Sequence, residues 1–181
     1  MIAWLNGPFG GGKTTLATTL QQELPGAVLF DAEEIGFLLR TVFPGKYKDF
    51  QDNPAWRPLV ADFAVRCHEE NDGQPVVIPM TLLRHDYATE IHGAIRAAGL
   101  PLRHLLLHAD TDTVNARIDA SVEFPDDEAR SEKVRAFRRR KLPTYTEAYQ
   151  GWLAADADVI DTTHLSPRQV ADQALKILGA Q

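Results

Sequence analysis

Residues 7–14 have the sequence GPFGGGKT and match the pattern GxxxxGK[ST] in full. Glycines allow consecutive backbone N–H groups to turn inward around an anion, and a helix that begins at the loop adds partial positive charge. The lysine of such a loop reaches the β- and γ-phosphates of ATP, and the next hydroxyl binds Mg²⁺. We therefore predict an ATP site with a catalytic lysine and Mg²⁺ on the hydroxyl. The predicted nucleotide contacts are Gly7, Phe9, Gly10, Gly11, Gly12, Lys13, Thr14 and Thr15.

The phosphate loop predicts nucleotide binding, and further residues must decide between hydrolysis, transfer and signalling. Asp31 follows an apolar run at residues 27–30, which places it at the carboxyl edge of a parallel sheet, toward the phosphates. Its carboxylate can accept a proton from a substrate hydroxyl or hold Mg²⁺ through water. It can also cap the next helix, since Glu33 and Glu34 suit a first turn, and the two roles are compatible. We predict that Asp31 is catalytic, contacts the substrate and binds the metal.

The third apolar run ends with Pro79, Met80 and Thr81 and has no acidic residue. Motor ATPases and GTPases place a Mg²⁺-binding aspartate on the corresponding strand. The pattern therefore favours a small-molecule kinase, in which substrate and lid complete the site.

Cations are concentrated on one helical segment near residues 130–141. Arg135 and Arg139 share a face at i,i+4 spacing, and a lid needs such charges over a phosphoryl group in transfer. The alternatives are a solvated helix balanced by the acidic residues at 126–128, or a nucleic-acid patch, for which only Phe137 supplies an interleaved aromatic ring. We predict that Arg135 and Arg139 are catalytic. The whole cluster comprises Arg130, Arg135, Arg138, Arg139, Arg140 and Lys141.

Two more residues are predicted to contact the nucleotide near its base. Arg117 could stack on adenine, although a surface ion pair is equally compatible with its position. Thr163 lies in residues 161–165, which follow the last strand, where small P-loop kinases place a loop against adenine. The alternative for this segment is a plain turn before the Ser166 cap.

Five apolar runs, at residues 2–6, 27–30, 74–80, 102–107 and 158–161, predict buried strands. The predicted helices lie at residues 13–24, 33–42, 55–70, 86–98, 111–120, 131–142 and 144–154, with a last one after the Ser166–Gln169 capping box. This alternation predicts an α/β P-loop NTPase fold, with a five-stranded parallel sheet and helices on both faces. The 181 residues suit one domain. Two long insertions, at about residues 32–73 and 121–155, are interpreted as a substrate cover and a lid.

The composition excludes several classes of protein. A net charge of −6 disfavours broad binding to nucleic acid or anionic membranes. No apolar run reaches the roughly 20 residues of a membrane span, and the N-terminus lacks a basic leader, so we expect a cytoplasmic protein with a small-molecule partner. The single cysteine, Cys67, has helical spacing to apolar neighbours and is interpreted as a core residue rather than a nucleophile.

The chain resembles the tunicamycin resistance protein family, within the small P-loop kinases that include chloramphenicol phosphotransferase and shikimate kinase. The likeness lies in residues 2–15, in FDAEEIGFLLR at 30–40, in the pair Trp56-Arg57 and in VIPMT at 77–81. These segments span roughly the first half of the chain, and beyond them only the order of elements matches.

The resemblance implies a kinase-like sheet, Mg²⁺-dependent ATP binding and a role against a nucleoside antibiotic or a related sugar-nucleoside. It implies phosphate and metal binding by Gly12, Lys13 and Thr14. The implied substrate contacts are Asp31, Arg40, Trp56, Arg57 and Thr81. Our leading prediction is ATP-dependent phosphorylation of a small-molecule hydroxyl. Sequestration of the ligand without turnover, and nucleotide hydrolysis in a regulatory role, remain alternatives.

Overall fold

The centre of the protein is a five-stranded parallel sheet, as the sequence predicts. The computed structural model describes residues 1–179, and the strand order is β2-β3-β1-β4-β5. All pairings are parallel, and β2 is shorter than predicted. The strands are β1 (Ile2–Asn6), β2 (Val28–Leu29), β3 (Val76–Pro79), β4 (Leu102–His108) and β5 (Asp158–Asp161).

Helices cover both faces of the sheet because side chains alternate along each strand. Ala3 and Leu5 of β1 face the cluster formed with α1 (Lys13–Glu23) and α8 (Pro167–Leu178). Trp4 belongs to the cluster on the opposite face, which is covered by α3 (Trp56–Glu70) and α4 (His85–Ala97).

The predicted start of the last helix is confirmed in atomic detail, and α3 begins one residue later than predicted. Ser166 and Gln169 form the capping box of α8, with a proline in its first turn. Asn53 accepts a hydrogen bond from the N–H of Ala55, just before α3. Cys67 packs against the core cluster on this helix, and burial raises the pKa of its thiol. This placement fits the interpretation of Cys67 as a packing residue.

The segment predicted as a substrate cover contains α2 (Glu33–Val42), the short helix η1 (Phe50–Asp52) and α3. Phe50 packs so closely on α2 that a Cβ at Gly36 would lie 2.5 Å from its ring. Glycine at this position therefore allows η1 to close on α2.

The segment predicted as a lid differs from the expected pair of helices. After α5 (Thr111–Asp119), one helix, α6 (Glu128–Ala148), continues through Pro143. Proline removes one helical hydrogen bond, but buried neighbours on both sides hold the helix: Leu142 packs beside α5 and Tyr145 packs on β4. The helix ends in a π-helical turn, η2 (Tyr149–Leu153), and the short helix α7 (Ala154–Asp156), which lead to β5.

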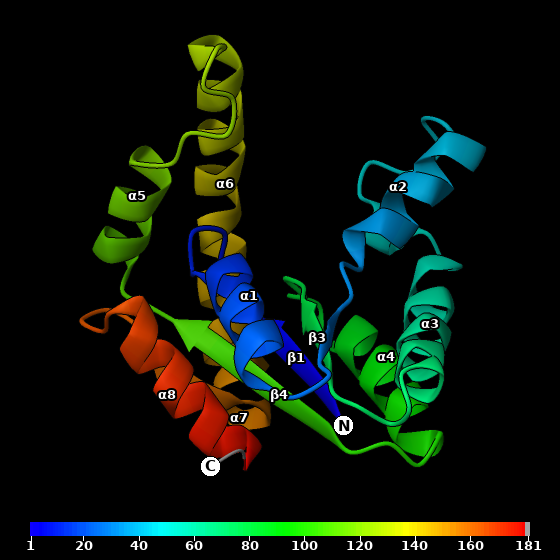
Figure 1. Ribbon diagram of the computed structural model, residues 1–181. Helices are drawn as coiled ribbons and strands as arrows, with labels where there is room; N and C mark the ends of the chain where they lie inside the picture. The colour runs from blue at the N-terminus through cyan, green and yellow to red at the C-terminus, as the bar shows by residue number, and fades with distance from the viewer. Residues whose placement is uncertain (180–181) are drawn as a thin grey trace.

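Figure 1 shows α6 and α2 extending beyond the sheet from opposite sides. The site described below lies between these two arms, at the carboxyl ends of the strands. No helix in residues 1–179 has both the length and the apolar character needed to cross a membrane.

Candidate functional site

The phosphate loop joins β1 to α1, and its shape depends on glycines. Gly10 and Gly12 have φ values of 79° and 90°, which side-chain-bearing residues rarely adopt. Gly7 passes so close to β4 that a Cβ would lie 2.6 Å from the carbonyl oxygen of Leu107. The first turn of α1 has no side-chain cap, so the amides at its N-terminus are available to an anion.

Lys13 folds back across the loop. Its Nζ donates hydrogen bonds to the carbonyl oxygens of Gly7 and Pro8, at 3.0 and 2.8 Å. Burial lowers the pKa of Lys13 to about 7, Glu33 opposes that shift and Arg138 adds to it. The side chains of Glu33 and Arg138 therefore both lie close enough to Nζ of Lys13 to change its pKa.

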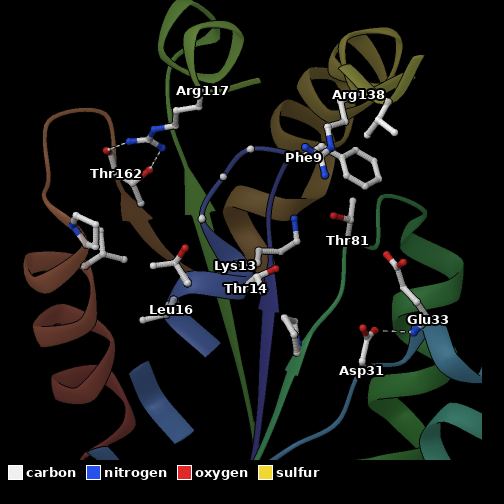
Figure 2. A pocket seen from close by; sticks show the side chains of 18 of the residues that line it. Phe9, Lys13, Thr14, Leu16, Asp31, Glu33, Thr81, Arg117, Arg138 and Thr162 are labelled. Carbon is white, nitrogen blue, oxygen red and sulfur yellow. Dashed lines mark hydrogen bonds between the residues drawn. The ribbon is translucent and has the colours of Figure 1, made fainter. Parts of the chain in front are cut away.

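A cavity of about 720 Å³ surrounds the loop. Figure 2 shows Lys13 and Thr14 at its centre, with Arg117 on one side and Asp31 on the other. The cavity thus has two ends of different chemistry around one phosphate-binding centre. The predicted loop contacts that line it are Phe9, Gly10, Gly11, Gly12, Lys13, Thr14 and Thr15.

The first end suits a flat, largely apolar group such as adenine. Leu165, Pro167 and Val170 supply apolar walls. Arg117 is held there because its guanidinium donates to the hydroxyl and the carbonyl oxygen of Thr162, at 2.9 and 2.7 Å. Arg117, on α5, therefore lines the cavity against the loop that follows β5.

Thr163, predicted to contact the nucleotide, is not among the described residues that line the cavity. Its hydroxyl accepts a hydrogen bond from the N–H of Asp110, at 3.1 Å. Thr162 lines the cavity instead. The predicted segment is therefore at the site, but the side chain that faces it comes from the neighbouring position.

The second end is acidic. Oδ1 of Asp31 accepts a hydrogen bond from the N–H of Glu33, at 2.9 Å, so Asp31 caps α2 and also lines the cavity. Glu33 lines it too, and burial together with Asp31 raises the pKa of the Glu33 carboxyl. Thr81 completes this end, and its hydroxyl donates to the carbonyl oxygen of Gly7 at 2.9 Å.

The lid helix places only one of its arginines in the cavity. Arg138 lines it, and its guanidinium also contacts Glu123 and the hydroxyl of Ser121. Arg135 and Arg139, predicted to be catalytic, are not among the described residues that line it.

Arg135 and Arg139 have other partners. Arg135 is buried and pairs with Glu128 and Glu132. Arg139 pairs with Asp119 and Glu132. The helix face that carries both arginines packs against α5 and against the loop before α6. The two side chains therefore link α6 to these segments.

Three residues implied as substrate contacts also have other partners. Trp56 is fully buried, and its indole N–H donates to the carbonyl oxygen of Ala32 at 3.1 Å. The guanidinium of Arg57 bonds to Glu90 and to the backbone of Gln51.

Arg40 stacks 5.1 Å above the ring of Phe50. None of the three lines the cavity within the described range. In this conformation the structure places Trp56, Arg57 and Arg40 in the cover that flanks the acidic end, and it does not bring them to the loop.

The residues present fit ATP and Mg²⁺. Mg²⁺ prefers hard oxygen ligands and keeps several waters. Both predicted metal ligands, Thr14 and Asp31, carry oxygen donors and line the same cavity. Oδ2 of Asp31 has no protein donor among the described residues, so it is free for such a role.

A family model described as an AAA domain, AAA_33, matches residues 2–145. The chain belongs to the AAA_33 family. None of the curated proteins matches it. Among solved structures, the tunicamycin resistance protein of Deinococcus radiodurans is 30% identical, covers 99% of this chain and 96% of its own, and superposes with a TM-score of 0.75. The predicted resemblance to that family is therefore confirmed.

Two kinases share the fold of this AAA_33 protein. A sugar kinase of a Janibacter species is 18% identical with a TM-score of 0.67, and the match covers 99% of this chain and 94% of the kinase. A gluconokinase of Sinorhizobium meliloti is 16% identical with a TM-score of 0.66, over 98% and 90% of the two chains. The AAA_33 match and the structure of the tunicamycin resistance protein confirm the predicted P-loop NTPase fold.

Sequence reasoning missed several residues of this AAA_33 site. The sequence pattern predicts only first-turn support for a helix from Glu33, whereas its position two residues after Asp31 is the signal for a second carboxylate in the cavity. Arg138 and Phe137 lie on the predicted lid helix, and both line the cavity. The ring of Phe137 meets the loop residue Phe9 edge-on, with centroids 5.6 Å apart, and no spacing rule singles out this pair.

Proposed function

We propose that the protein is an ATP-dependent phosphotransferase that acts on a hydroxyl of a small molecule. One observation carries this proposal: a single cavity contains the phosphate loop between an end suited to adenine and an acidic end suited to an acceptor. A plain nucleotide hydrolase needs only the first end. The acidic end therefore favours transfer to a substrate.

At the centre of the site, Lys13 and Arg138 are the cations that would hold the phosphoryl oxygens. The backbone of the loop and Lys13 bind the β- and γ-phosphates, and Arg138 neutralises charge that develops in transfer. Bound Mg²⁺ would be held by Thr14 and, through water, by Asp31, and it would neutralise phosphate charge. Arg138 replaces Arg135 and Arg139 in this role because only its side chain lines the cavity.

At the acidic end, Asp31 orients the acceptor and takes its proton. The acceptor oxygen forms a bond to the γ-phosphorus, and its proton moves to Oδ2 of Asp31. The bond between the γ-phosphorus and the bridging oxygen breaks, and ADP leaves with the electron pair. Oδ1 remains on the N–H of Glu33, which fixes the direction of the carboxylate.

The substrate cover and the lid would exclude water from this reaction. The cover at about residues 32–73 and the lid at about 121–155 already meet at one ion pair, where Nζ of Lys141 lies 3.5 Å from Oδ2 of Asp49. The charge of Asp49 also contributes to the raised pKa of Glu33, so this contact between the two arms lies near the acidic end.

The proposed acceptor is a nucleoside antibiotic such as tunicamycin, with a role in resistance. The tunicamycin resistance protein of Deinococcus radiodurans supports this choice. Sequestration of the antibiotic without turnover is the second candidate, because a resistance protein can also act by binding its drug.

Mass spectrometry of tunicamycin incubated with the protein, ATP and Mg²⁺ tests the proposal. We expect a product heavier by one phosphate, with ADP formed in equal amount. Unmodified drug that binds in the presence of ATP would establish sequestration. ADP formed without phosphorylated drug or retained drug would establish hydrolysis.

A further inference from the structure

A buried polar pair lies directly behind the phosphate loop. Asn6, the last residue of β1, is 0% exposed, and His104 on the neighbouring strand β4 is 4% exposed. Neither lines the cavity described above within residues 1–179. Buried polar side chains in such positions need a physical reason, because an unsatisfied one destabilises the fold.

The orientation of the Asn6 amide follows from its partners. Its Oδ1 accepts from two backbone N–H groups, those of Gly7 at 2.8 Å and Leu82 at 3.0 Å. A backbone N–H can only donate, so the amide oxygen must face both. The amide nitrogen Nδ2 therefore points the other way, where it donates to the carbonyl oxygen of Leu82 at 2.8 Å and reaches Nε2 of His104 at 3.3 Å.

This orientation also determines the state of His104. Because Nδ2 of Asn6 is a donor, Nε2 of His104 must accept, which requires a neutral ring with its proton on Nδ1. Burial lowers the pKa of His104 to about 4, so the ring is neutral at pH 7. The rings of His92 and Trp152 pack around it, with centroids at 4.8 and 6.2 Å, and hold its position.

The Asn6 amide acts on the residue where the phosphate loop begins. The N–H of Gly7 is bound by Asn6, and its carbonyl oxygen accepts from Lys13 at 3.0 Å and from Thr81 at 2.9 Å. If Oδ1 and Nδ2 of Asn6 exchanged places, the NH₂ group would face the N–H of Gly7. Two donors would then oppose each other at the residue that anchors the catalytic lysine.

We propose that His104 is a positioning residue for the phosphate loop. By accepting a hydrogen bond from Nδ2, it reinforces the orientation that the backbone of Leu82 sets and so helps to hold the oxygen of Asn6 on the N–H of Gly7. This role depends on nucleotide binding by the loop and not on phosphoryl transfer, so it holds for either a kinase or a sequestering protein.

Three variants separate this role from simple packing. His104→Phe keeps a ring but removes the acceptor. His104→Gln retains an acceptor oxygen near the position of Nε2 and should rescue the loop. His92→Phe is the matched control, because His92 is equally buried and its Nε2 has no hydrogen-bond partner in the described part of the chain.

Two measurements on folded protein test the proposal. Amide exchange by NMR without nucleotide should be about tenfold faster at Gly7 and Leu82 in His104→Phe, and near wild type in His104→Gln and His92→Phe. The dissociation constant for ATP should rise about tenfold in His104→Phe alone. If the phenylalanine variant does not fold, His104→Met removes the acceptor with a flexible side chain.

Wild-type exchange at Gly7 in the variant without an acceptor would overturn the proposal. So would a His104→Gln protein that is as impaired as His104→Phe. A wild-type protein that binds no ATP would instead contradict the proposed function, and the exchange rates would still decide the role of His104.

Discussion

The phosphate loop and the lid helix α6 both carry positive charge to the same cavity, yet they differ in how their residues are positioned. In the loop, glycine dihedral angles and backbone carbonyls hold Lys13 locally, within eight residues. In α6, the arginines Arg135, Arg138 and Arg139 lie within little more than one turn and have different surroundings. All three pair with acidic residues, but of the three only Arg138 also lines the cavity.

A high density of charge on a helix is therefore weak evidence that its residues belong to a functional site. Arg135, with a side chain only 8% exposed, serves the packing of α6 against the preceding loop. The predictions below test whether residues that line the cavity matter more for function than charged residues outside it.

The largest effect is expected at the loop. Lys13→Ala should remove measurable ATP binding while the protein remains folded, because the variant leaves the phosphate charge at the loop uncompensated. Calorimetric titration of ATP checks this. Lys141→Ala is the matched control: its ammonium pairs with Asp49 and lies outside the cavity lining. Unchanged ATP affinity in Lys13→Ala would contradict the phosphate-loop assignment.

The pKa of Lys13 adds a pH dependence to the same prediction. In the free protein this pKa is lowered to about 7, and bound phosphate must raise it. ATP binding above pH 7 should therefore take up a proton, and affinity should fall as pH rises, up to about tenfold per pH unit. Titrations at pH 8 in buffers of different ionisation enthalpy measure this uptake, and equal heats in all buffers would contradict it.

Asp31→Asn should retain ATP binding but slow phosphoryl transfer by about 10²–10⁴. Asparagine can still accept the hydrogen bond from the N–H of Glu33, so α2 keeps its cap. Single-turnover phosphorylation of the identified acceptor is the measurement, with ATP affinity from the same preparation. Glu34→Gln provides the control, as a neighbouring carboxylate that is exposed and outside the cavity lining. Wild-type turnover in Asp31→Asn would reduce Asp31 to a helix cap.

The smallest of the three effects compares two arginines on α6. Arg138→Gln should lower the transfer rate roughly a hundredfold, as for loss of one preorganised donor to a developing charge. Arg139→Gln should leave the rate within about twofold, because its partners are Asp119 and Glu132 and the pair is exposed. Steady-state rates on the same acceptor separate them. Equal losses would mean that the arginines of the lid act through their combined charge, whether or not they line the cavity.

Much of the architecture could be predicted because its causes are local. Apolar runs alternate with helical periodicity, so the five strands follow from pattern, and the Ser166 capping box follows from four residues. Pro143 is the informative exception. A local rule ends the helix there, but packing of Leu142 and Tyr145 on either side carries α6 through it.

The phosphate loop, the succession of strands and helices along the chain and the position of Asp31 after the second strand could all be predicted from the sequence, because each depends on short-range pattern or backbone geometry. The order of the strands in the sheet and the set of side chains that share the cavity came only from the folded structure. Periodicity defines the faces of a helix but not which face meets a partner far along the chain. Packing therefore selected Arg138 over Arg139, Thr162 over Thr163, and Glu33 as a second carboxylate, and it buried Trp56 in the core.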